Sequence, residues 1–416
     1  MKKLESQFVY LDHAATTSVD KRVKKTMDPF YTTNFGNPSS LYASGLFSKR
    51  AIDKSRKIVA DFFHTNSYNI YFTGGGTESI NMAIFGVVKK HAKSGKHLIT
   101  SKIEHEAVLS SMKRLEKEDF EVTYLDVDVD GFVSLNDLKK AIRPDTVLIS
   151  VMYANNEIGT VEPIAEIGRL ILKHRKDNNT IYPIFHTDAC QATNYLDMDV
   201  EKLHVDLMST NGSKIYAAKG VGVLFKRKEI KIEPLFYGGG QESGLRSGTE
   251  DVPAIVGLGK ALEIITEERE AEIKRLVGLR QYFWDKLQEK IAKIRLNGPC
   301  LDDLKTRLPN NLNVTFLDIE GEALLLYLDA VNIMCSTGSA CTSLSLDPSH
   351  VLTACGLPYE YSHGSLRFTL GKENNKKQID YVMEHLPRIV EKLRKISPVN
   401  LAYDPNKNNH PKIHQR

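Results

Sequence analysis

The stretch Asn69-Ile-Tyr-Phe-Thr73-Gly-Gly-Gly-Thr77-Glu-Ser79 begins a strand–turn–helix unit that decides the fold class. An apolar run ends at three glycines, and a helical pattern follows them. This alternation continues to residue 225, with strands predicted at 69–74, 96–101, 121–127, 146–154, 182–188, 205–210 and 220–225. Helices are predicted between them at 77–91, 105–118, 134–142 and 166–176. Such alternation predicts an α/β fold with a mostly parallel seven-stranded sheet covered on both faces.

The chain beyond residue 225 predicts a second unit. A long stretch from 252 to about 294, rich in Glu, Lys, Arg and Leu, predicts a helix that bridges two domains. Strands at 312–318 and 365–371 and helices at 320–329 and 376–396 predict a smaller α+β unit. Because 416 residues are too many for one compact core, we expect a division into several parts. These are a large domain (15–260), a small domain (1–14 and 261–396) and a tail (397–416) that is flexible or a docking arm.

Composition and charge exclude several classes of protein. Apolar residues make up 41% and charged residues 26% of the chain, as in ordinary soluble proteins. A net charge of +4 without a polybasic stripe does not favour direct binding of nucleic acid. The N-terminus lacks the apolar stretch of a signal peptide, and no apolar run approaches the roughly 20 residues of a membrane helix. We therefore expect a cytoplasmic protein without membrane contact.

The pattern of cysteines and acids predicts no metal. Five scattered cysteines do not form a disulfide framework, and no Cys-x-x-Cys pair predicts a zinc site. Asp126, Asp128, Asp130 and Asp137 approach the spacing of a calcium loop. However, a strand precedes them, and the last position is Asp rather than Glu. We expect instead an Asp-Gly turn and a helix that begins at Ser134.

Polar groups follow several predicted strands, where ligands bind in such folds. The three glycines before Thr77 lie at a helix start, which favours a phosphate, although such turns are often only structural. Asp188 ends the strand at 182–188, where an acid can keep a pyridine nitrogen protonated. Gln191 is close enough in sequence to reach the same ring.

Lys214 follows the strand at 205–210 and is a candidate for covalent attachment of a cofactor. A lysine there can form a Schiff base if the pocket lowers its pKa. Lys219 lies nearby, and nearly all of the 56 Lys and Arg residues are expected to be solvated. Only the combination of the phosphate-favouring glycine turn, the acid and the lysine is therefore informative about function.

Cys341 follows the run of small residues Ser336-Thr-Gly-Ser-Ala, which predicts a mobile loop that carries a thiol. An exposed loop cysteine can act as a nucleophile in its thiolate form, but spacing alone leaves open an incidental loop thiol. Cys335, at the apolar base of the loop, and Cys190 and Cys355 are expected to be packing residues.

Eight motifs, in order along roughly residues 8 to 395, resemble those of one enzyme family. They are Tyr10-Leu-Asp-His-Ala-Ala-Thr-Thr, Gly36-Asn-Pro-Ser-Ser, the turn Thr73–Ser79, Asn155-Asn-Glu-Ile-Gly159, Ser213-Lys-Ile-Tyr, Gly238-Gly-Gly-Gln-Glu, Arg246-Ser-Gly-Thr249 and Gly338-Ser-Ala-Cys341-Thr-Ser. The chain resembles the cysteine desulfurases that supply sulfur for iron–sulfur assembly. These belong to the class V aminotransferase group of fold-type I pyridoxal-phosphate enzymes.

This resemblance implies a cofactor, pyridoxal 5'-phosphate, and residues that bind it. Lys214 resembles the Schiff-base lysine, Asp188 the partner of the ring nitrogen, and His105 the residue stacked on the ring. Asn156 and Gln191 resemble the contacts of the phenolic oxygen. The remaining cofactor residues implied are Gly76, Thr77, Asn211, Ser213 and, from the other subunit of a homodimer, Thr249.

The resemblance also implies the substrate and the reaction. Asn37 and Arg367 resemble the groups that hold L-cysteine, with Arg367 taking its carboxylate as a bidentate pair. Lys214 would remove the α-proton, and Cys341 would attack the substrate sulfur, which leaves L-alanine and a persulfide. The long loop around Cys341 resembles the subgroup that delivers sulfur to a scaffold or thiolation protein, for iron–sulfur assembly or tRNA thiolation.

Some positions depart from the family pattern. Ser213 stands where the family usually has His before the lysine, and serine can donate a hydrogen bond but carries no positive charge. Asn211 stands where the family often has Ser, and Ala217-Ala218 where it usually has Gly-Pro. Tyr42 stands where the family frequently has His. None of these removes a reacting atom, but the affinity for the cofactor and the pKa of Lys214 stay open.

Two alternatives therefore remain at this point. The first is a selenocysteine lyase or another pyridoxal-phosphate β-lyase, which relative turnover of cysteine and selenocysteine would separate. The second is a non-catalytic sulfur or cluster scaffold, which Lys214 disfavours and Ser213 leaves open. A purified protein without pyridoxal absorbance would support the scaffold.

Overall fold

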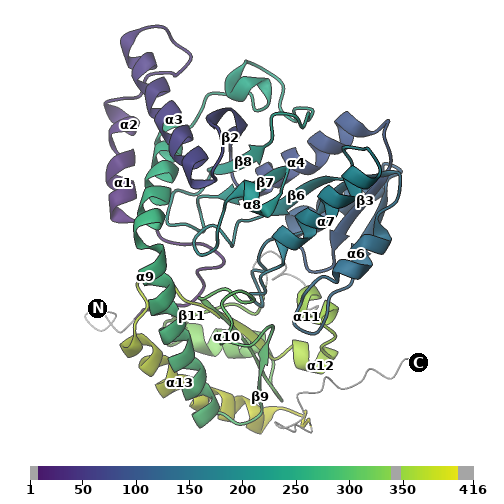
Figure 1. Cartoon of the computed structure of the whole chain (residues 1–416). Helices are drawn as coiled ribbons and strands as arrows, with labels where there is room; N and C mark the ends of the chain where they lie inside the picture. Colours follow the sequence, from purple (N-terminus) through teal and green to yellow (C-terminus); the bar gives the residue numbers. More distant parts are fainter. Residues whose placement is uncertain (1–7, 339–347, 402–416) are drawn as a thin grey trace.

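The computed structural model describes residues 8–338 and 348–401, and a seven-stranded sheet lies at its centre (Figure 1). The strand order is β2-β8-β7-β6-β5-β3-β4, and all neighbours are parallel except β8, which runs antiparallel to β2 and β7. The strands are β2 (Ile70–Thr73), β3 (His97–Ser101), β4 (Glu121–Leu125), β5 (Thr146–Ser150), β6 (Ile184–Asp188), β7 (Leu207–Asn211) and β8 (Gly222–Lys226). The predicted mostly parallel sheet is confirmed.

The central strands are apolar on both faces because helices cover both. Leu148 and Ile184 pack in a cluster with α4 (Gly76–His91) and α5 (Glu106–Glu116). Their neighbours Ile149 and Phe185 belong to a second cluster on the opposite face. There the covering helices include α6 (Leu135–Ala141), α7 (Ile164–Asp177) and α8 (Val200–Leu203). Because side chains alternate along a strand, a continuous apolar run is what two covered faces require.

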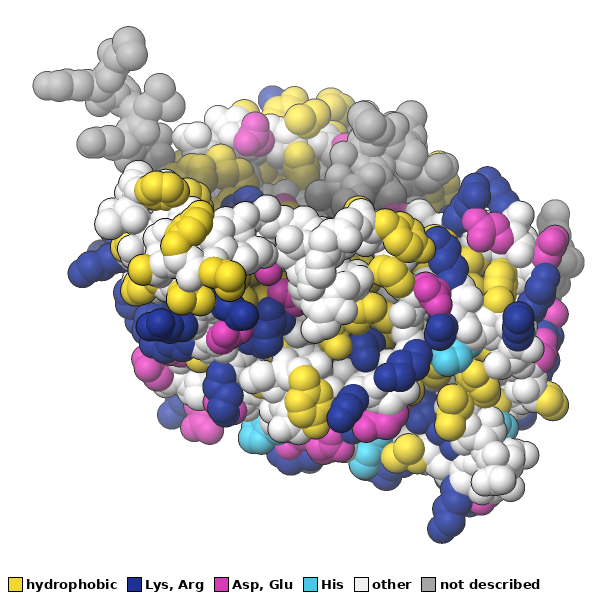
Figure 2. All heavy atoms as spheres, turned by 90° about the horizontal axis from the view of Figure 1, so that it is seen from above, with side chains coloured by type: hydrophobic (Ala, Val, Ile, Leu, Met, Phe, Trp, Pro, Cys, Tyr) yellow, Lys and Arg dark blue, Asp and Glu magenta, His cyan; other side chains and the backbone are white. Residues whose placement is uncertain are grey.

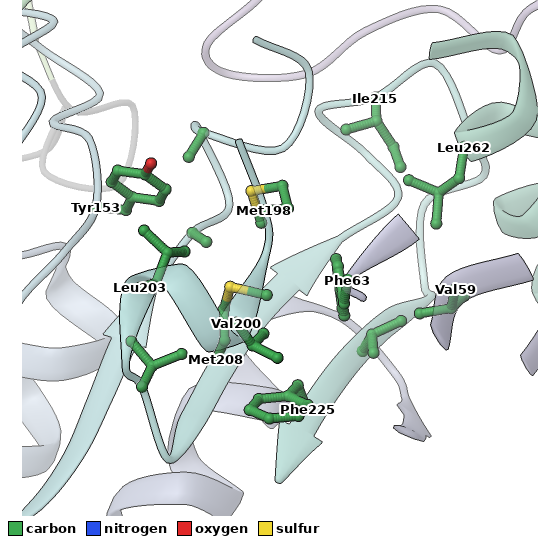
Figure 3. Close-up of a cluster of buried hydrophobic side chains, with 14 of the residues drawn as sticks. Val59, Phe63, Tyr153, Met198, Val200, Leu203, Met208, Ile215, Phe225 and Leu262 are labelled. Carbon is green, nitrogen blue, oxygen red and sulfur yellow. The ribbon is translucent and has the colours of Figure 1, made fainter. Parts of the chain in front are cut away.

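Three helices near the N-terminus also pack on this second cluster and were not predicted. They are α1 (Lys21–Met27), α2 (Pro29–Thr32) and α3 (Ala43–Phe62). Val59 of α3 and Phe63 lie beside Phe225 and Leu262 in the same core (Figure 3). The buried face of α3 includes the small residues Gly45, Ser48 and Ser55 as well as Ile52 and Val59.

The helix α9 (Val252–Lys290) connects two hydrophobic cores (Figure 1). Its first half places Leu258 and Leu262 in the core of the large sheet. Its second half places Leu279 and Phe283 in a separate cluster. The predicted long helix is therefore confirmed. It ends at Lys290 rather than at about residue 294, where a strand begins instead.

The second core surrounds a three-stranded antiparallel sheet, in the order β12-β10-β9. Its strands are β9 (Ile294–Asn297), β10 (Asn311–Phe316) and β12 (Ser365–Thr369). The helices α10 (Gly321–Asp329) and α13 (Lys376–Ile396) pack on it, and β1 (Val9–Tyr10) pairs in parallel with β11 (Ile333–Met334). The short elements are α11 (His350–Ala354), α12 (Tyr359–Ser362) and the 3-10 helices η1 (Ser67–Asn69) and η2 (Gln241–Gly244). Most of the predicted tail, 402–416, lies outside the described residues.

The acidic stretch after β4 forms a turn. Asp128 Oδ1 accepts hydrogen bonds from the backbone N–H groups of Asp130 (3.0 Å) and Phe132 (2.9 Å). Ser134 caps α6, as predicted, by accepting from the N–H of Asp137 (3.2 Å). Within 8–338 and 348–401, no three His, Cys, Asp or Glu side chains are grouped to hold a metal ion.

None of the helices in the described part of the chain combines the length and the apolar character needed to cross a bilayer.

Candidate active site

A cavity of about 660 Å³ lies at the carboxyl ends of the parallel strands, and several strands contribute a residue to its wall. Its volume is in the range of small-molecule sites, roughly 300–1,000 Å³. Predicted residues from distant parts of the chain meet there, as expected for an α/β sheet. They are Gly76, Thr77, His105, Asn156, Asp188, Gln191, Asn211, Ser213, Lys214 and Arg367.

The glycine turn between β2 and α4 forms one wall. Gly75 has a φ of +145°, which side chains rarely adopt. A Cβ at Gly76 would lie 2.8 Å from Cys190 Sγ and 2.9 Å from Asn211 Nδ2, so only glycine fits without displacing a neighbour. The first N–H groups of the sixteen-residue α4 have no partner within the helix, and the helix dipole adds positive potential. The turn can therefore bind an anion such as a phosphate.

Asp188 provides a buried carboxylate on the wall formed by β6. It is 6% exposed, and its Oδ1 accepts a hydrogen bond from the N–H of Cys190 at 2.9 Å. Two residues earlier, the ring of His186 lies between the hydroxyls of Ser150 (2.8 Å) and Ser209 (3.0 Å). Burial lowers the pKa of His186 to about 4, so this ring is neutral and does not compensate the charge of Asp188. The site therefore favours a ligand that brings a positive charge or a hydrogen-bond donor to Asp188.

Lys214 also lines the cavity, and its amine is fixed by backbone acceptors. Its Nζ donates hydrogen bonds to the carbonyl oxygens of Ala14 and Ala15, each at 2.5 Å. The backbone beside it is also fixed, because the Ser213 carbonyl accepts from the N–H of Thr17 (2.8 Å). The Lys214 carbonyl accepts from Asn194 Nδ2 at 2.7 Å. These contacts hold the amine toward the cavity.

His105 and Gln191 are oriented by hydrogen bonds at their polar ends. His105 caps α5, and its Nδ1 accepts from the N–H of Ala107 at 3.1 Å. Gln191 Nε2 donates to the carbonyl of Ala14 at 3.0 Å. Both side chains therefore have restricted rotation at the cavity wall.

Arg367, on β12, brings a buried positive charge to the cavity. Its Nη2 pairs with Asp12 Oδ1 at 2.7 Å, and its Nη1 donates to the carbonyl of Asn156 at 3.1 Å. Arg367 is 1% exposed, and its Nε is buried without a hydrogen-bond partner among the described residues. Nε has almost no accessible surface, so Arg367 meets the cavity with other atoms of its side chain, and its positive charge is what a carboxylate in the cavity could pair with.

Three predicted residues do not line this cavity. Asn37 is exposed, and its Oδ1 accepts from the N–H of Ser39 at 2.9 Å. Thr249 lines a neighbouring cavity of about 220 Å³ with Gly74 and Arg246. Cys341, predicted as the nucleophile, lies outside the described residues.

The sequence analysis missed several residues of the site. The carbonyls of Ala14 and Ala15 hold the lysine, although the motif that contains them was noted without a role. Cys190, expected only to pack, is buried but also lines the cavity, and burial raises its pKa well above the usual value. Cys335 and Cys355 are buried, as predicted. Local patterns could not find Ala14 because it lies 200 residues from Lys214.

Glu104 is a fully buried acid next to His105. Its Oε1 accepts from Ser101 Oγ and from the N–H of Met152, both at 2.8 Å, whereas Oε2 has no partner among the described residues. Burial, and in smaller part the charge of Asp188, raises the pKa of Glu104 to about 8. Its carboxyl is therefore mostly neutral at pH 7.

The Glu104→Gln variant should lose a pH dependence of stability that the wild type has. In the unfolded chain this carboxyl ionises near 4.5, whereas the folded chain keeps its proton up to about 8. Between these values the unfolded chain binds fewer protons, so wild-type stability falls as pH rises, by up to about 1.4 kcal/mol per pH unit. Urea denaturation from pH 5 to 8 measures this slope, with Glu106→Gln as the less buried control. Parallel pH profiles for wild type and Glu104→Gln would contradict the assignment.

The comparisons with known proteins agree with this geometry. The chain matches the family model "Aminotransferase class-V" over residues 9–382. It is 52% identical over 395 residues to "Cysteine desulfurase IscS" of Methanosarcina thermophila, which covers 95% of each chain. The chain belongs to the cysteine desulfurase family. The present chain also matches a solved "NifS-like protein", with a TM-score of 0.85 and 36% identity. The match covers 93% of the present chain and 100% of the solved one. The structure "SspA in complex with cysteine" matches with a TM-score of 0.77 at 36% identity, covering 87% and 98%.

Cysteine desulfurases and the wider class V aminotransferase family depend on pyridoxal phosphate. The cavity fits that group in three respects. The glycine turn at α4 leaves space that a Cβ at Gly76 would fill, Asp188 offers a buried carboxylate, and Lys214 presents an amine. Ser213 lines the cavity without bringing a charge to it, whereas the helix start of α4 brings positive potential.

Proposed function

We propose that this chain converts L-cysteine to L-alanine and retains the sulfur as a persulfide on Cys341. The observation that carries the proposal is the single cavity in which an anion-binding helix start, a buried acid, a lysine amine and a buried arginine meet. The cysteine desulfurase family of the chain and its likeness to a protein solved with cysteine support this choice of substrate.

We propose that the cavity binds pyridoxal 5'-phosphate through Lys214, with the phosphate at Gly76, Thr77, Asn211 and Ser213. When bound, the cofactor supplies an electron sink that lets the α-proton leave and the bond between Cβ and sulfur break. Asp188 would keep the ring nitrogen protonated, His105 would lie against the ring, and Asn156 and Gln191 would contact its phenolic oxygen.

The amine of Lys214 is the base in this proposal. The carbonyls of Ala14 and Ala15 hold it at the cavity wall, and a carbonyl can accept a hydrogen bond but cannot take a proton at neutral pH. The guanidinium of Arg367 would hold the carboxylate of L-cysteine as a bidentate pair. The contact of Asn37 with the substrate stays a prediction, because Asn37 is exposed and does not line the cavity. The substrate would then present its α-proton to Lys214.

Cys341 would accept the sulfur in its thiolate form. A bond forms between its Sγ and the sulfur of L-cysteine, the bond between that sulfur and Cβ breaks, and Cβ is protonated to give L-alanine. Sulfur is oxidised and carbon is reduced within the same step, so no external oxidant or reductant is required. The persulfide would pass to an iron–sulfur scaffold or a tRNA-thiolation protein.

We also propose that the chain works as a homodimer. The loops before α3 and after β8 expose large apolar side chains, including Leu41 (89%), Tyr237 (80%) and Phe35 (77%). This end of the molecule faces the viewer in Figure 2, which shows hydrophobic side chains gathered on it. Phe236 is partly exposed on this end and also lines the cavity, so a second subunit here would border the active site and could contribute Thr249.

Replacement of Cys341 tests the proposed function. The Cys341→Ser variant should keep the absorbance of the bound cofactor but lose nearly all formation of L-alanine from L-cysteine. Mass spectrometry of the wild type after incubation with L-cysteine should find the additional sulfur on Cys341, with Cys300, the exposed cysteine of the described part, as the control thiol. Unchanged alanine production by Cys341→Ser in the presence of reductant would contradict the persulfide.

A further inference from the structure

Asn155 joins two loops that each bring a residue to the cavity. The loop after β3 carries His105, and the loop after β5 carries Asn156. Because β3 and β5 are neighbouring parallel strands, the two loops leave the same edge of the sheet. Asn155 is 0% exposed and does not itself line the cavity, so it can act on a ligand there only through its neighbours.

The amide nitrogen of Asn155 bonds to the loop that carries His105. Its Nδ2 donates to the carbonyl of Ile103 at 3.0 Å. Ile103 is 0% exposed, and it packs with Met152 and Ile158 of the second loop in one apolar cluster. Since only one residue separates Ile103 from His105, this hydrogen bond restricts where the histidine ring can lie.

The amide oxygen of Asn155 holds the loop that carries Asn156. Its Oδ1 accepts hydrogen bonds from the N–H groups of Glu157 (2.8 Å) and Ile158 (3.0 Å), which forms a turn closed by a side chain. The backbone of Asn155 contributes as well, because its N–H donates to the carbonyl of Thr160 at 2.8 Å. Asn156 therefore lies inside a turn that Asn155 closes with both its side chain and its backbone.

Other contacts hold the two loops at different points. Glu104 Oε1 accepts from the N–H of Met152 at 2.8 Å, nearer to the end of β5. On the side of the small sheet, the carbonyl of Asn156 accepts from Arg367 Nη1 at 3.1 Å. Among the hydrogen bonds of residues 8–338 and 348–401, the bond from Asn155 to Ile103 is the one that joins the turn directly to the loop of His105.

We propose that Asn155 is a positioning residue for the ring of the cofactor. By joining the turn around Asn156 to the loop of His105, it sets the distance between the side chain that stacks on the ring and the side chain that contacts its phenolic oxygen. Asn155 touches neither cofactor nor substrate. This role rests on the proposed binding of pyridoxal 5'-phosphate in the cavity.

An amide suits this position because it offers a donor and an acceptor at the end of one short side chain. In Asn155→Asp, the carboxylate keeps an acceptor for the turn but sets an oxygen against the carbonyl of Ile103. In Asn155→Ser, the hydroxyl can still accept within the turn but is too short to extend to Ile103. The two variants therefore break the same contact in different ways.

The test measures binding of the cofactor rather than turnover. The apoprotein of Asn155→Asp should bind pyridoxal 5'-phosphate about 10- to 100-fold more weakly than wild type, as expected when a buried acceptor loses its donor. At saturating cofactor, the maximum of its visible absorbance should also shift, because His105 and Asn156 lie differently against the ring. A merely destabilised protein would not show this shift, since the saturated complex is folded.

Asn374→Asp is the matched control, because Asn374 has the same kind of contacts elsewhere. It is 2% exposed, its Oδ1 accepts from the N–H of Gly371 (2.7 Å), and its Nδ2 donates to the carbonyl of Tyr10 (2.9 Å). It does not line the cavity, so Asn374→Asp should keep the wild-type affinity and absorbance maximum. Equal changes in Asn374→Asp and Asn155→Asp would overturn the positioning role.

Asn155→Ser keeps the test decisive if the introduced carboxylate prevents folding. It adds no charge and should show both a weaker affinity and a shifted maximum. Wild-type affinity and a wild-type maximum in either folded variant would show that the contact with Ile103 does not position the ring.

The same measurements test the cofactor proposal separately. If the wild-type apoprotein forms no linked, visibly absorbing complex with pyridoxal 5'-phosphate, the proposed function fails. If wild type forms this complex and the Asn155 variants match it, only the positioning role fails.

Discussion

Lys214→Ala should lose the covalently attached cofactor and reduce turnover of L-cysteine by a factor on the order of 10³, as expected when the group that moves a proton is removed. The amine of Lys214 is the cavity-lining amine that two backbone carbonyls hold in place. Two described neighbours cannot form the linkage in its place, because Ser213 has no amine and Arg367 is engaged with Asp12. The loss should appear as missing visible absorbance of the linked cofactor and as absence of a borohydride-stable adduct.

Lys219→Ala is the matched control for this experiment. Lys219 lies five residues from Lys214, and its Nζ donates to the carbonyl of Thr17 at 3.2 Å, next to the segment that holds Lys214. It does not line the cavity, so Lys219→Ala should retain the adduct and most of the activity. A borohydride-stable adduct that persists in Lys214→Ala would move the linkage to another lysine and remove the basis of the proposed mechanism.

Local pattern in the sequence predicted the sheet and part of the site, and the resemblance to the family implied the other site residues. The alternation of strands and helices can be predicted from short local stretches of sequence, so all seven strands of the large sheet were predicted. The candidates Asp188 and Lys214 end or follow strands, and the parallel arrangement then brings them to one edge. No long-range contact had to be known to place them together.

What the sequence could not predict depends on contacts between distant segments. Asp12 and Arg367 are 355 residues apart, yet they form the ion pair that orients the guanidinium. The carboxyl of Glu104 looks like any surface acid in the sequence, and only its burial raises its pKa. The helix α3 lies before residue 69, where the strand–helix alternation begins, and it was not predicted. The domain boundaries at residues 15, 260 and 396 stay a prediction, although α9 does contribute to two separate cores.

Arg367→Lys should weaken binding of L-alanine, the product of the proposed reaction, by about 10- to 100-fold. The loss corresponds to the roughly 1.5–3 kcal/mol of a hydrogen bond to a charged group. Lysine keeps a positive charge for Asp12 but has no planar fork, so it cannot pair with Asp12 and with a carboxylate in the same geometry. Titration of the cofactor absorbance with L-alanine measures the affinity without sulfur chemistry.

Alaninamide separates carboxylate binding from a general disturbance of the cavity. It has the amine and the methyl group of alanine but no negative charge, so it gains nothing from the guanidinium of Arg367. The affinity for alaninamide should therefore be nearly the same in wild type and Arg367→Lys. The charge of the Arg367 guanidinium leads to this difference, because it pairs with a carboxylate but not with a neutral amide. Equal losses for both ligands would instead assign Arg367 to the support of Asp12 and Asn156, and the substrate carboxylate would need another partner.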